Sequence, residues 1–234
     1  MRVLALDTST EVAGVALLAE GRPRFSHSFL HRMDLSQRLL PSLQWLLAGT
    51  GVPFSSIEAL VVGRGPGSFT GVRIGVTTAK VLAQVTGIPL VGVGTLAAMA
   101  AAFEACRGLL VCPAIDARKH EVYGALYRMG EEGPVEVLAP RAMPAEALAR
   151  CAAEYDEPVA VCGTGAARYR AALEAALGTR LRAAPGHDFP DPVVLAHLGL
   201  RRLARGERDD PLALVPIYAR PSEAERNLQA SGQA

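Results

Sequence analysis

The sequence predicts an α/β protein with two small lobes, each a mixed sheet with flanking helices. Two observations support this fold class. Short apolar strands alternate with helical segments along the chain, and the pattern of the first half restarts near residue 109. An apolar strand ending at Asp7 is followed by a Glu-Val-x-Gly segment at 11–14, and one ending at Asp116 is followed by the same segment at 121–124.

The restart divides the chain into predicted lobes at residues 1–106 and 107–220, followed by a polar tail at 221–234 that we expect to be disordered. The first lobe opens with short apolar strands separated by turn residues, which predicts a meander. A leucine repeat at helical spacing follows it. The expected elements of this lobe are strands at 3–6, 12–18 and 24–30, a helix at 35–48, a strand at 57–62, a helix at 68–85, a strand at 90–93 and a helix at 95–105.

The second lobe repeats this order. Pro144 stands at the first turn of a predicted helix, where proline is tolerated, and Gly163-Thr164-Gly165 separates a strand from the helix after it. We assign every element up to residue 220 to this lobe. The expected elements are strands at 109–115, 120–127 and 135–138, a helix at 144–153, a strand at 159–162, helices at 166–177 and 192–205, and a closing strand at 215–219.

Composition indicates a globular protein. Of the 234 residues, 50% are hydrophobic and 20% are charged, which provides an ample core. The net charge of +1 gives no general electrostatic reason for the chain to bind nucleic acid by itself. The 4 cysteines lack metal-binding spacing and indicate core residues in a reducing compartment. Asp7 interrupts the first apolar run, and no segment is long enough to span a membrane, so we expect a soluble, cytoplasmic protein.

A glycine loop, Gly-Arg-Gly-Pro-Gly at 63–67, connects a buried strand to the helix that Ser68 opens. Such a connection leaves several backbone N–H groups unpaired and aimed at one point, so we expect an anion or a polar group of a partner there. The loop matches no phosphate-binding fingerprint. Thr70 stands where GxGxxG requires its third glycine, and no Gly-Lys-Ser/Thr follows.

The helix after the loop carries a stripe of small side chains. Gly71, Gly75, Ala79 and Ala83 recur at every fourth residue and therefore share one face. A glycine inside a helix costs about 1 kcal/mol relative to alanine, so two of them indicate close packing. The stripe packs either against another helix of the same lobe or against a partner chain, and the sequence leaves both open.

Three segments together resemble the TsaB (YeaZ) family, which is related to the TsaD (Gcp) enzymes: VLALDTST at 3–10, GPGSFTGVRIG at 65–75 and AIDARKHEVY at 114–123. The resemblance extends over about residues 1–220. It implies a duplicated actin-like ATPase fold, related to ribonuclease H, in a small version.

The resemblance also implies a role. The chain would be a non-catalytic subunit that binds and activates a TsaD-type protein in forming N6-threonylcarbamoyladenosine on tRNAs reading codons that begin with A. A TsaE-type ATPase would join the assembly, and a TsaC-type enzyme would supply the threonylcarbamoyl-adenylate. The chain would need no cofactor of its own, although ATP or ADP could bind at the level of the complex. It would contact tRNA only through the complex and form a homodimer when alone.

In the family, the helices at 35–48 and 68–85 form the contact with TsaD or with a second copy. Leucines of the first helix, and small or charged residues of the second, are therefore the candidate interface. The interface residues are Leu35, Leu39, Leu43, Gly71, Arg73, Gly75, Thr77, Ala79 and Lys80.

Asp7 and Asp116 end the first strands of the two lobes, where large actin-like enzymes place carboxylates facing phosphates and metal. Nearby hydroxyl groups and the glycine loop could complete an anion site. The candidate nucleotide or anion contacts are Asp7, Thr8, Ser9, Gly65, Gly67, Ser68 and Asp116. The alternative, which we favour, is that both carboxylates accept hydrogen bonds from nearby backbone N–H groups.

We expect no metal site and no catalytic residue. By resemblance, the HxxxH metal pair of TsaD falls on Thr95 and Met99. His27 and His31 also have this spacing, but in a strand they lie about 13 Å apart, too far to share an ion. The alternatives are a Gcp-like peptidase and a stand-alone nucleotide-binding sensor, which hydrolysis assays and ATP titration of the isolated chain would reveal.

Overall fold

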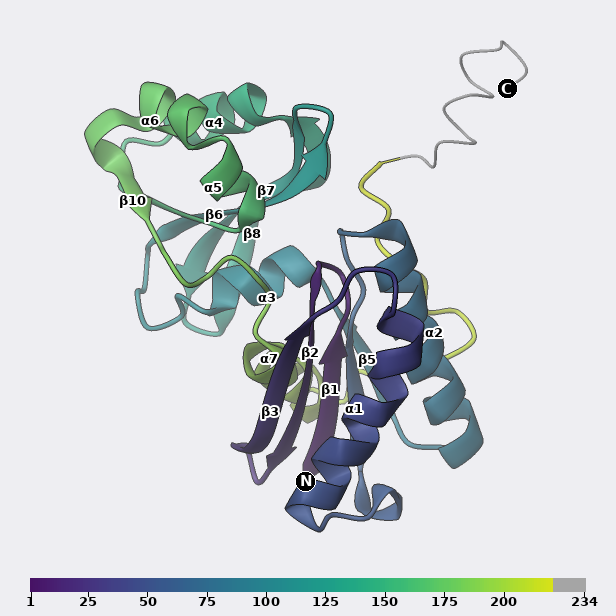
Figure 1. Cartoon of the computed structure of the whole chain (residues 1–234). Coiled ribbons are helices and arrows are strands. Elements are labelled where there is room, and N and C mark those ends of the chain that lie inside the picture. Colours follow the sequence, from purple (N-terminus) through teal and green to yellow (C-terminus); the bar gives the residue numbers. More distant parts are fainter. Residues whose placement is uncertain (221–234) are drawn as a thin grey trace.

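The computed structural model describes residues 1–220, and the predicted tail lies outside the described residues. Two five-stranded sheets form two lobes (Figure 1). The first sheet has the order β3-β2-β1-β4-β5, in which β2 is antiparallel to β1 and β3, whereas β4 and β5 run parallel to β1. Its strands are β1 (Arg2–Asp7), β2 (Val12–Ala19), β3 (Arg22–Leu30), β4 (Ala59–Gly63) and β5 (Leu90–Val93).

The second sheet repeats this topology, with the order β10-β9-β6-β7-β8. Here β6, β7 and β8 form the antiparallel meander, and β9 and β10 add in parallel beyond β6. The prediction of a duplicated α/β fold with two mixed sheets is therefore confirmed. The strands are β6 (Leu110–Arg118), β7 (Glu121–Gly130), β8 (Gly133–Pro144), β9 (Val159–Cys162) and β10 (Leu181–Ala183).

Seven α-helices and two short 3₁₀ turns cover the sheets within the described residues. The helix predicted at 166–177 is divided in two at Tyr169. The elements are α1 (Leu35–Thr50), η1 (Phe54–Ser56), α2 (Phe69–Thr86), α3 (Thr95–Ala101), α4 (Ala145–Ala153), α5 (Thr164–Arg168), α6 (Arg170–Leu177), η2 (Gly178–Arg180) and α7 (Pro192–Ala204).

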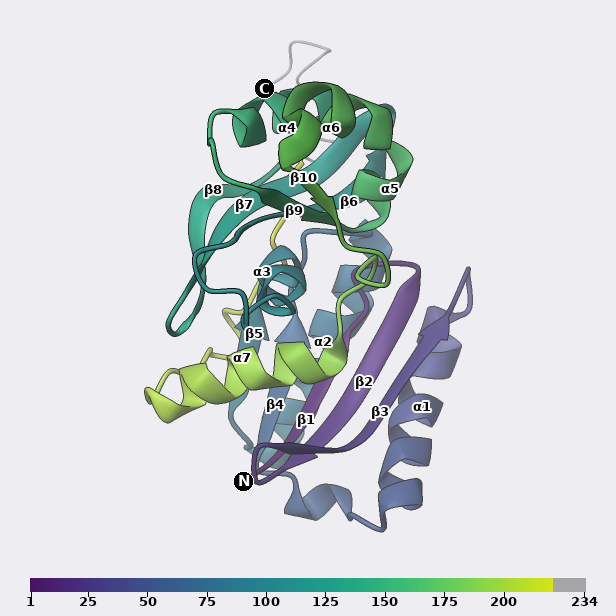
Figure 2. The same ribbon diagram turned by 90° about the vertical axis from the view of Figure 1, so that its left-hand side faces the viewer.

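The elements stack in layers (Figures 1 and 2). Helices α1 and α2 cover one face of the first sheet, where Leu4, Leu6 and Val15 are buried. The other face is covered by α7, through Leu195 and Ala196. Helix α3 lies between α7 and the inner face of the second sheet, and α4 to α6 cover the outer face of that sheet.

The predicted boundary between the lobes is wrong for the end of the chain. Helix α7, assigned to 107–220, packs on β1, β2 and β5 of the first sheet. Gly199 allows this approach, because a Cβ there would lie 2.3 Å from the side chain of Val61. The segment after α7 also returns to the first lobe, where Leu214 is buried beside α2. The first lobe is therefore made of two separate pieces of sequence.

Residues 209–220, which we call the C-terminal strap, run along the first lobe and end on the second. The closing strand predicted at 215–219 is not formed; the strap makes one isolated bridge, between Asp209 and Leu90. Two further backbone hydrogen bonds join it to other segments, from Ile217 N to Arg64 O and from Ala142 N to Ala219 O. The strap is the yellow segment beside α2 in Figure 1.

Candidate functional site

Helix α2 begins and ends at residues suited to those positions. The Ser68 hydroxyl accepts a hydrogen bond from Gly71 N at 3.3 Å, which caps the first turn. Gly87 ends the helix with φ of +71°, a conformation that glycine adopts without strain. The predicted helix is therefore confirmed, and its two faces can be assigned.

The stripe of small residues on α2 faces the interior of its own lobe. A Cβ at Gly71 would lie 2.1 Å from Thr8 O, and one at Gly75 would lie 2.2 Å from Thr8 Oγ1. Ala79 and Ala83 are also buried. Gly71 and Gly75 thus pack against Thr8 at the end of β1, inside their own lobe, and the prediction that Gly71, Gly75 and Ala79 contact a partner directly is wrong.

The leucines predicted for the interface on α1 are buried in the same way. Leu35, Leu39 and Leu43 have between 1% and 5% of their surface exposed and belong to the core beneath the helix. Periodicity identified their shared face correctly, but this is the face that packs on the sheet. The outward face of α1 presents other residues, including Leu40 and Trp45.

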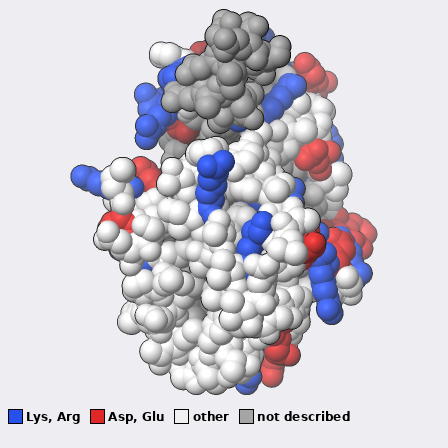
Figure 3. Space-filling model, turned by 90° about the vertical axis from the view of Figure 1, so that its right-hand side faces the viewer, with Lys and Arg blue, Asp and Glu red and all other residues white. Residues whose placement is uncertain are grey.

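The outward faces of α1 and α2 expose several large apolar residues and lack carboxylates. No Asp or Glu occurs in either helix or in the strap from 211 to 220. In Figure 3, which shows the molecule from the α2 side, most of this surface is uncharged and basic groups stand near its centre. We call this surface the acid-free face. The exposed large apolar residues of the two helices and the strap are Leu40, Trp45, Phe69, Val81, Val85, Leu212, Val215 and Tyr218. Among them, Trp45 lies at the β3 edge, where its ring contacts Phe25 and His27.

Arg73, Thr77 and Lys80 of the predicted interface lie on the outer side of α2, as expected. The two cations hold the C-terminal strap. Lys80 Nζ donates hydrogen bonds to the carbonyl oxygens of Leu212 at 3.2 Å and Leu214 at 2.9 Å. Arg73 Nε donates to the Tyr218 hydroxyl at 2.9 Å.

The glycine loop uses most of its backbone donors within the chain. The N–H groups of Arg64 and Ser68 donate to Val93 O and Ser9 O, and that of Gly65 donates to the Thr95 hydroxyl. Few donors remain for the predicted anion. The glycines are needed for close approach, because a Cβ at Gly67 would lie 2.1 Å from Ser9 O.

Asp7 is completely buried beside this loop. Its Oδ1 accepts hydrogen bonds from Ser9 N and Ser9 Oγ at 2.8 and 2.6 Å, and its Oδ2 accepts one from Thr95 Oγ1 at 3.1 Å. Burial raises the pKa of the Asp7 carboxyl above its ordinary value. These hydrogen bonds lower the pKa, but by less than burial raises it. Thr8 and Ser9 are buried too, so these three predicted nucleotide contacts have no accessible surface in this structure.

Asp116 differs from Asp7, because 18% of its side chain is exposed. Its carboxylate forms an ion pair with Arg168 at 2.8 Å and accepts a hydrogen bond from the Tyr169 hydroxyl at 3.4 Å. It also accepts a bond from Arg118 N at 3.0 Å. The two aspartates therefore differ in setting: Asp7 is buried in the first lobe, and Asp116 is partly exposed on the second.

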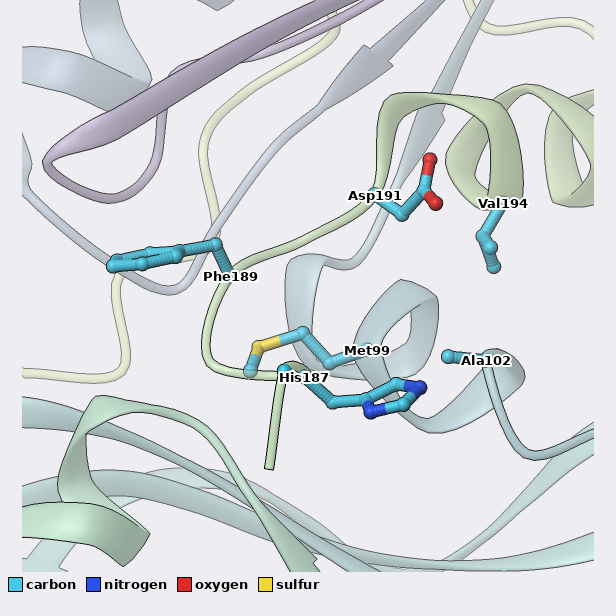
Figure 4. A pocket seen from close by; sticks show the side chains of 7 residues that line it. Met99, Ala102, His187, Phe189, Asp191 and Val194 are labelled. Atoms are coloured by element: carbon cyan, nitrogen blue, oxygen red, sulfur yellow. The ribbon is translucent and has the colours of Figure 1, made fainter. Parts of the chain in front are cut away.

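The positions predicted to replace a metal pair are interior. Thr95 and Met99 are buried, and Met99 borders a cavity of about 210 Å³ between α3, the connector before α7, and α7 itself (Figure 4). His187 and Asp191 also line the cavity, and the Asp191 carboxylate caps α7 by accepting a bond from Val193 N at 2.7 Å. Within residues 1–220, no three His, Cys, Asp or Glu side chains group closely enough to bind a metal ion.

Sequence reasoning missed the outward apolar residues of α1 and α2 and the whole strap. The signal was present, because Val81 and Val85 of α2 lie outside the face that its small residues share, and they are large apolar residues left exposed. No helix among the described residues has the length and apolar character needed to cross a bilayer.

Comparisons with known proteins agree on one family. The family model described as "TsaD: tRNA N6-adenosine threonylcarbamoyltransferase" matches residues 31–226. The TsaB protein of Bacillus subtilis is 36% identical over 229 residues, covering 96% of both chains. The TsaB protein of Escherichia coli is 46% identical over 134 residues, covering 57% of this chain and 58% of that protein. Both carry the name tRNA threonylcarbamoyladenosine biosynthesis protein.

Solved structures give the same result. YeaZ from Pseudomonas aeruginosa is 34% identical with a TM-score of 0.79, covering 93% of this chain and 99% of that one. Component A of the Acidaminococcus fermentans (R)-2-hydroxyglutaryl-CoA dehydratase has a TM-score of 0.52 at 11% identity, which supports the fold alone.

Proposed function

This chain belongs to the TsaB (YeaZ) family of tRNA threonylcarbamoyladenosine biosynthesis proteins, and from that premise we propose that it is a partner subunit without catalysis of its own. It binds a TsaD-type protein and activates it in forming N6-threonylcarbamoyladenosine on tRNAs that read codons beginning with A. The observation that carries the proposal is the acid-free face on α1 and α2.

The acid-free face has the composition of a protein interface. Val85 and Val81 expose 80% and 51% of their surface, and Leu40 exposes 51% on the neighbouring helix. Clustered large apolar residues of this kind mark interaction surfaces. Trp45, at 56% exposed, is of a residue type that dominates binding energy, and Phe69, at 44% exposed, is of a type enriched at interfaces. The sequence-based choice of helices is retained, but the contacts move to their outward residues.

The interior of the chain supports the absence of catalysis. The Asp7 carboxylate is enclosed and its oxygens accept bonds from Ser9 and Thr95. A Cβ at Gly63 would lie 1.8 Å from Asp7 Oδ2, so the backbone closes over the carboxylate. Thr95 and Met99 serve as packing residues where, by resemblance, the TsaD metal pair would stand.

The proposal includes the other partners expected from the family. A TsaE-type ATPase joins the assembly, ATP or ADP binds at the level of the complex, and tRNA is contacted through it. Without the TsaD-type protein, the same face pairs two copies of this chain. Burial of an apolar face explains why one surface would serve both associations.

The test is binding of the TsaD-type protein from the same organism, measured by calorimetry, with threonylcarbamoyladenosine formation measured by mass spectrometry. Val85→Asp places a charge in the interface at a position where the monomer leaves the side chain free. We expect binding and tRNA modification to be lost. Val135→Asp is the matched control, because Val135 is 58% exposed on β8 of the other lobe. Equal binding by both variants would refute the proposal.

The competing functions are a Gcp-like peptidase and a nucleotide sensor. One solved relative from Pseudomonas aeruginosa is described as similar to "peptidase YEAZ". Hydrolysis of a peptide or ATP by the purified chain, abolished by Asp116→Asn, would favour an enzyme. Calorimetric binding of ATP with Mg²⁺ to the chain alone would favour the sensor.

A further inference from the structure

Arg73 is held in one orientation at the edge of the acid-free face. Its guanidinium carbon lies 3.8 Å from the centre of the Phe69 ring and 5.7 Å from that of Tyr218. The two rings are 5.4 Å apart, and the Tyr218 hydroxyl accepts a hydrogen bond from Arg73 Nε at 2.9 Å. Two aromatic contacts and one hydrogen bond therefore fix a side chain that is normally mobile.

The rest of the guanidinium has no partner among residues 1–220. Among the described residues, Arg73 forms no ion pair, and its two terminal nitrogens donate no hydrogen bond. Other cations near this face are engaged: Arg38 pairs with Asp34 at 3.6 Å, Arg220 pairs with Glu121, and Lys80 donates to backbone carbonyl oxygens. Arg73 thus offers a fixed pair of N–H donors on a surface to which α1, α2 and residues 211–220 contribute no carboxylate.

We propose that Arg73 receives a carboxylate of the partner protein, with Tyr218 of the C-terminal strap as the positioning residue. This inference rests on the proposed function and names the chemistry that the partner must present. A guanidinium binds a carboxylate through two parallel N–H···O bonds when its orientation is fixed. Charge complementarity predicts an Asp or Glu on the partner beside an apolar surface.

The C-terminal strap fixes the orientation of the Arg73 guanidinium. Tyr218 is 47% exposed and reaches α2 from a strap that Lys80 of the same helix holds at Leu212 and Leu214. Fixing the guanidinium before binding reduces the conformational entropy lost when the complex forms. The inference therefore separates two roles: Arg73 touches the partner, and Tyr218 sets the direction of the donors.

The experiment titrates the full chain with the TsaD-type protein, without nucleotide, at several salt concentrations. We expect Arg73→Gln to raise Kd by about tenfold to a hundredfold and to reduce the salt dependence of binding. Tyr218→Phe keeps the ring but removes the hydrogen-bond acceptor, so a smaller increase in Kd with the salt dependence retained is expected. Arg118→Gln, which removes an exposed positive charge from the other lobe, is the matched control.

Reciprocal substitution identifies the acceptor. Asp and Glu residues of the partner are changed singly to Lys, and one of these changes should restore binding to Arg73→Glu. The inference is overturned if Arg73→Gln and Arg118→Gln bind the TsaD-type protein equally well while Val85→Asp fails to bind it. That outcome would leave the proposed function unaffected. Loss of affinity in Arg73→Gln only when ATP is present would assign the arginine to phosphate and also overturn it. Absence of wild-type binding would refute both.

Discussion

Gly75→Ala tests where the small stripe of α2 packs. On an open helix face this change would stabilise the protein, because alanine is favoured over glycine by about 1 kcal/mol. Here the new Cβ would lie 2.2 Å from Thr8 Oγ1 and 3.5 Å from Leu6 Cδ1. The Thr8 side chain must move, and its buried hydroxyl would lose the 2.7 Å hydrogen bond to Gly71 O.

The magnitude follows from these contacts. Overpacking costs about 1–3 kcal/mol, and leaving a buried hydroxyl unpaired costs about 1–3 kcal/mol. After the gain in helix propensity, we expect the free energy of unfolding to fall by about 1–5 kcal/mol. Urea denaturation followed by circular dichroism measures it. Thr77→Ala, on the exposed side of the same helix, should change stability by less than about 0.5 kcal/mol.

A double-mutant cycle identifies the contact. Thr8→Ala removes the obstructing hydroxyl, so it should lessen the effect of Gly75→Ala, with a coupling free energy of about 1–3 kcal/mol. A Gly75→Ala protein that is more stable than the wild type would refute the packing of the stripe on β1. It would return the stripe to the role of a partner surface.

Three further predictions follow from burial. Because burial raises the pKa of Asp7 above 3.8, the folded state binds this proton more tightly, and the free energy of unfolding should fall as the pH rises from 3.8 toward the folded pKa. Asp7→Asn should remove that part of the pH dependence of the unfolding free energy, measured by urea denaturation between pH 4 and 7. An unchanged pH profile would contradict the raised pKa of Asp7. Leu214→Ala should lower the free energy of unfolding by about 2–5 kcal/mol, whereas Leu212→Ala, exposed beside it, should change it little. In thiol titration Cys106 should react first, since it is exposed, and Cys112 should react only on unfolding, because burial raises its pKa to about 12.

Sequence periodicity predicted the order of the helices and strands. It did not predict whether a given helix face points into the lobe or outward. Leu35 and Leu39 share a helix face, and Gly71 and Gly75 share another, as predicted. Both faces turned out to be interior. Hydrophobic periodicity identifies which residues are buried together, whereas a partner surface on the same helix consists of the few apolar residues left outside, such as Val85.

The end of the chain shows a second limit. An amphipathic helix can cover any apolar sheet face, and nothing local in residues 192–204 says which sheet it covers. Assigning α7 to the nearer lobe was reasonable from sequence order and wrong in space. The internal bonding of Asp7 agreed with the alternative favoured from sequence, because an Asp-x-Ser segment at a strand end readily forms such local hydrogen bonds.

The return of α7 to the first lobe has a consequence for biosynthesis. As the ribosome releases the chain, strands β1, β2 and β4 are complete long before the helix that covers one of their faces. Val3, Ala5, Leu18 and Val61 line that face and are fully buried only once residues 192–204 have arrived. The nascent first lobe must therefore wait with an apolar sheet face open to solvent and to other chains. Truncated or stalled products should therefore aggregate. The first lobe can complete its native fold only after the last fifth of the chain has been synthesised.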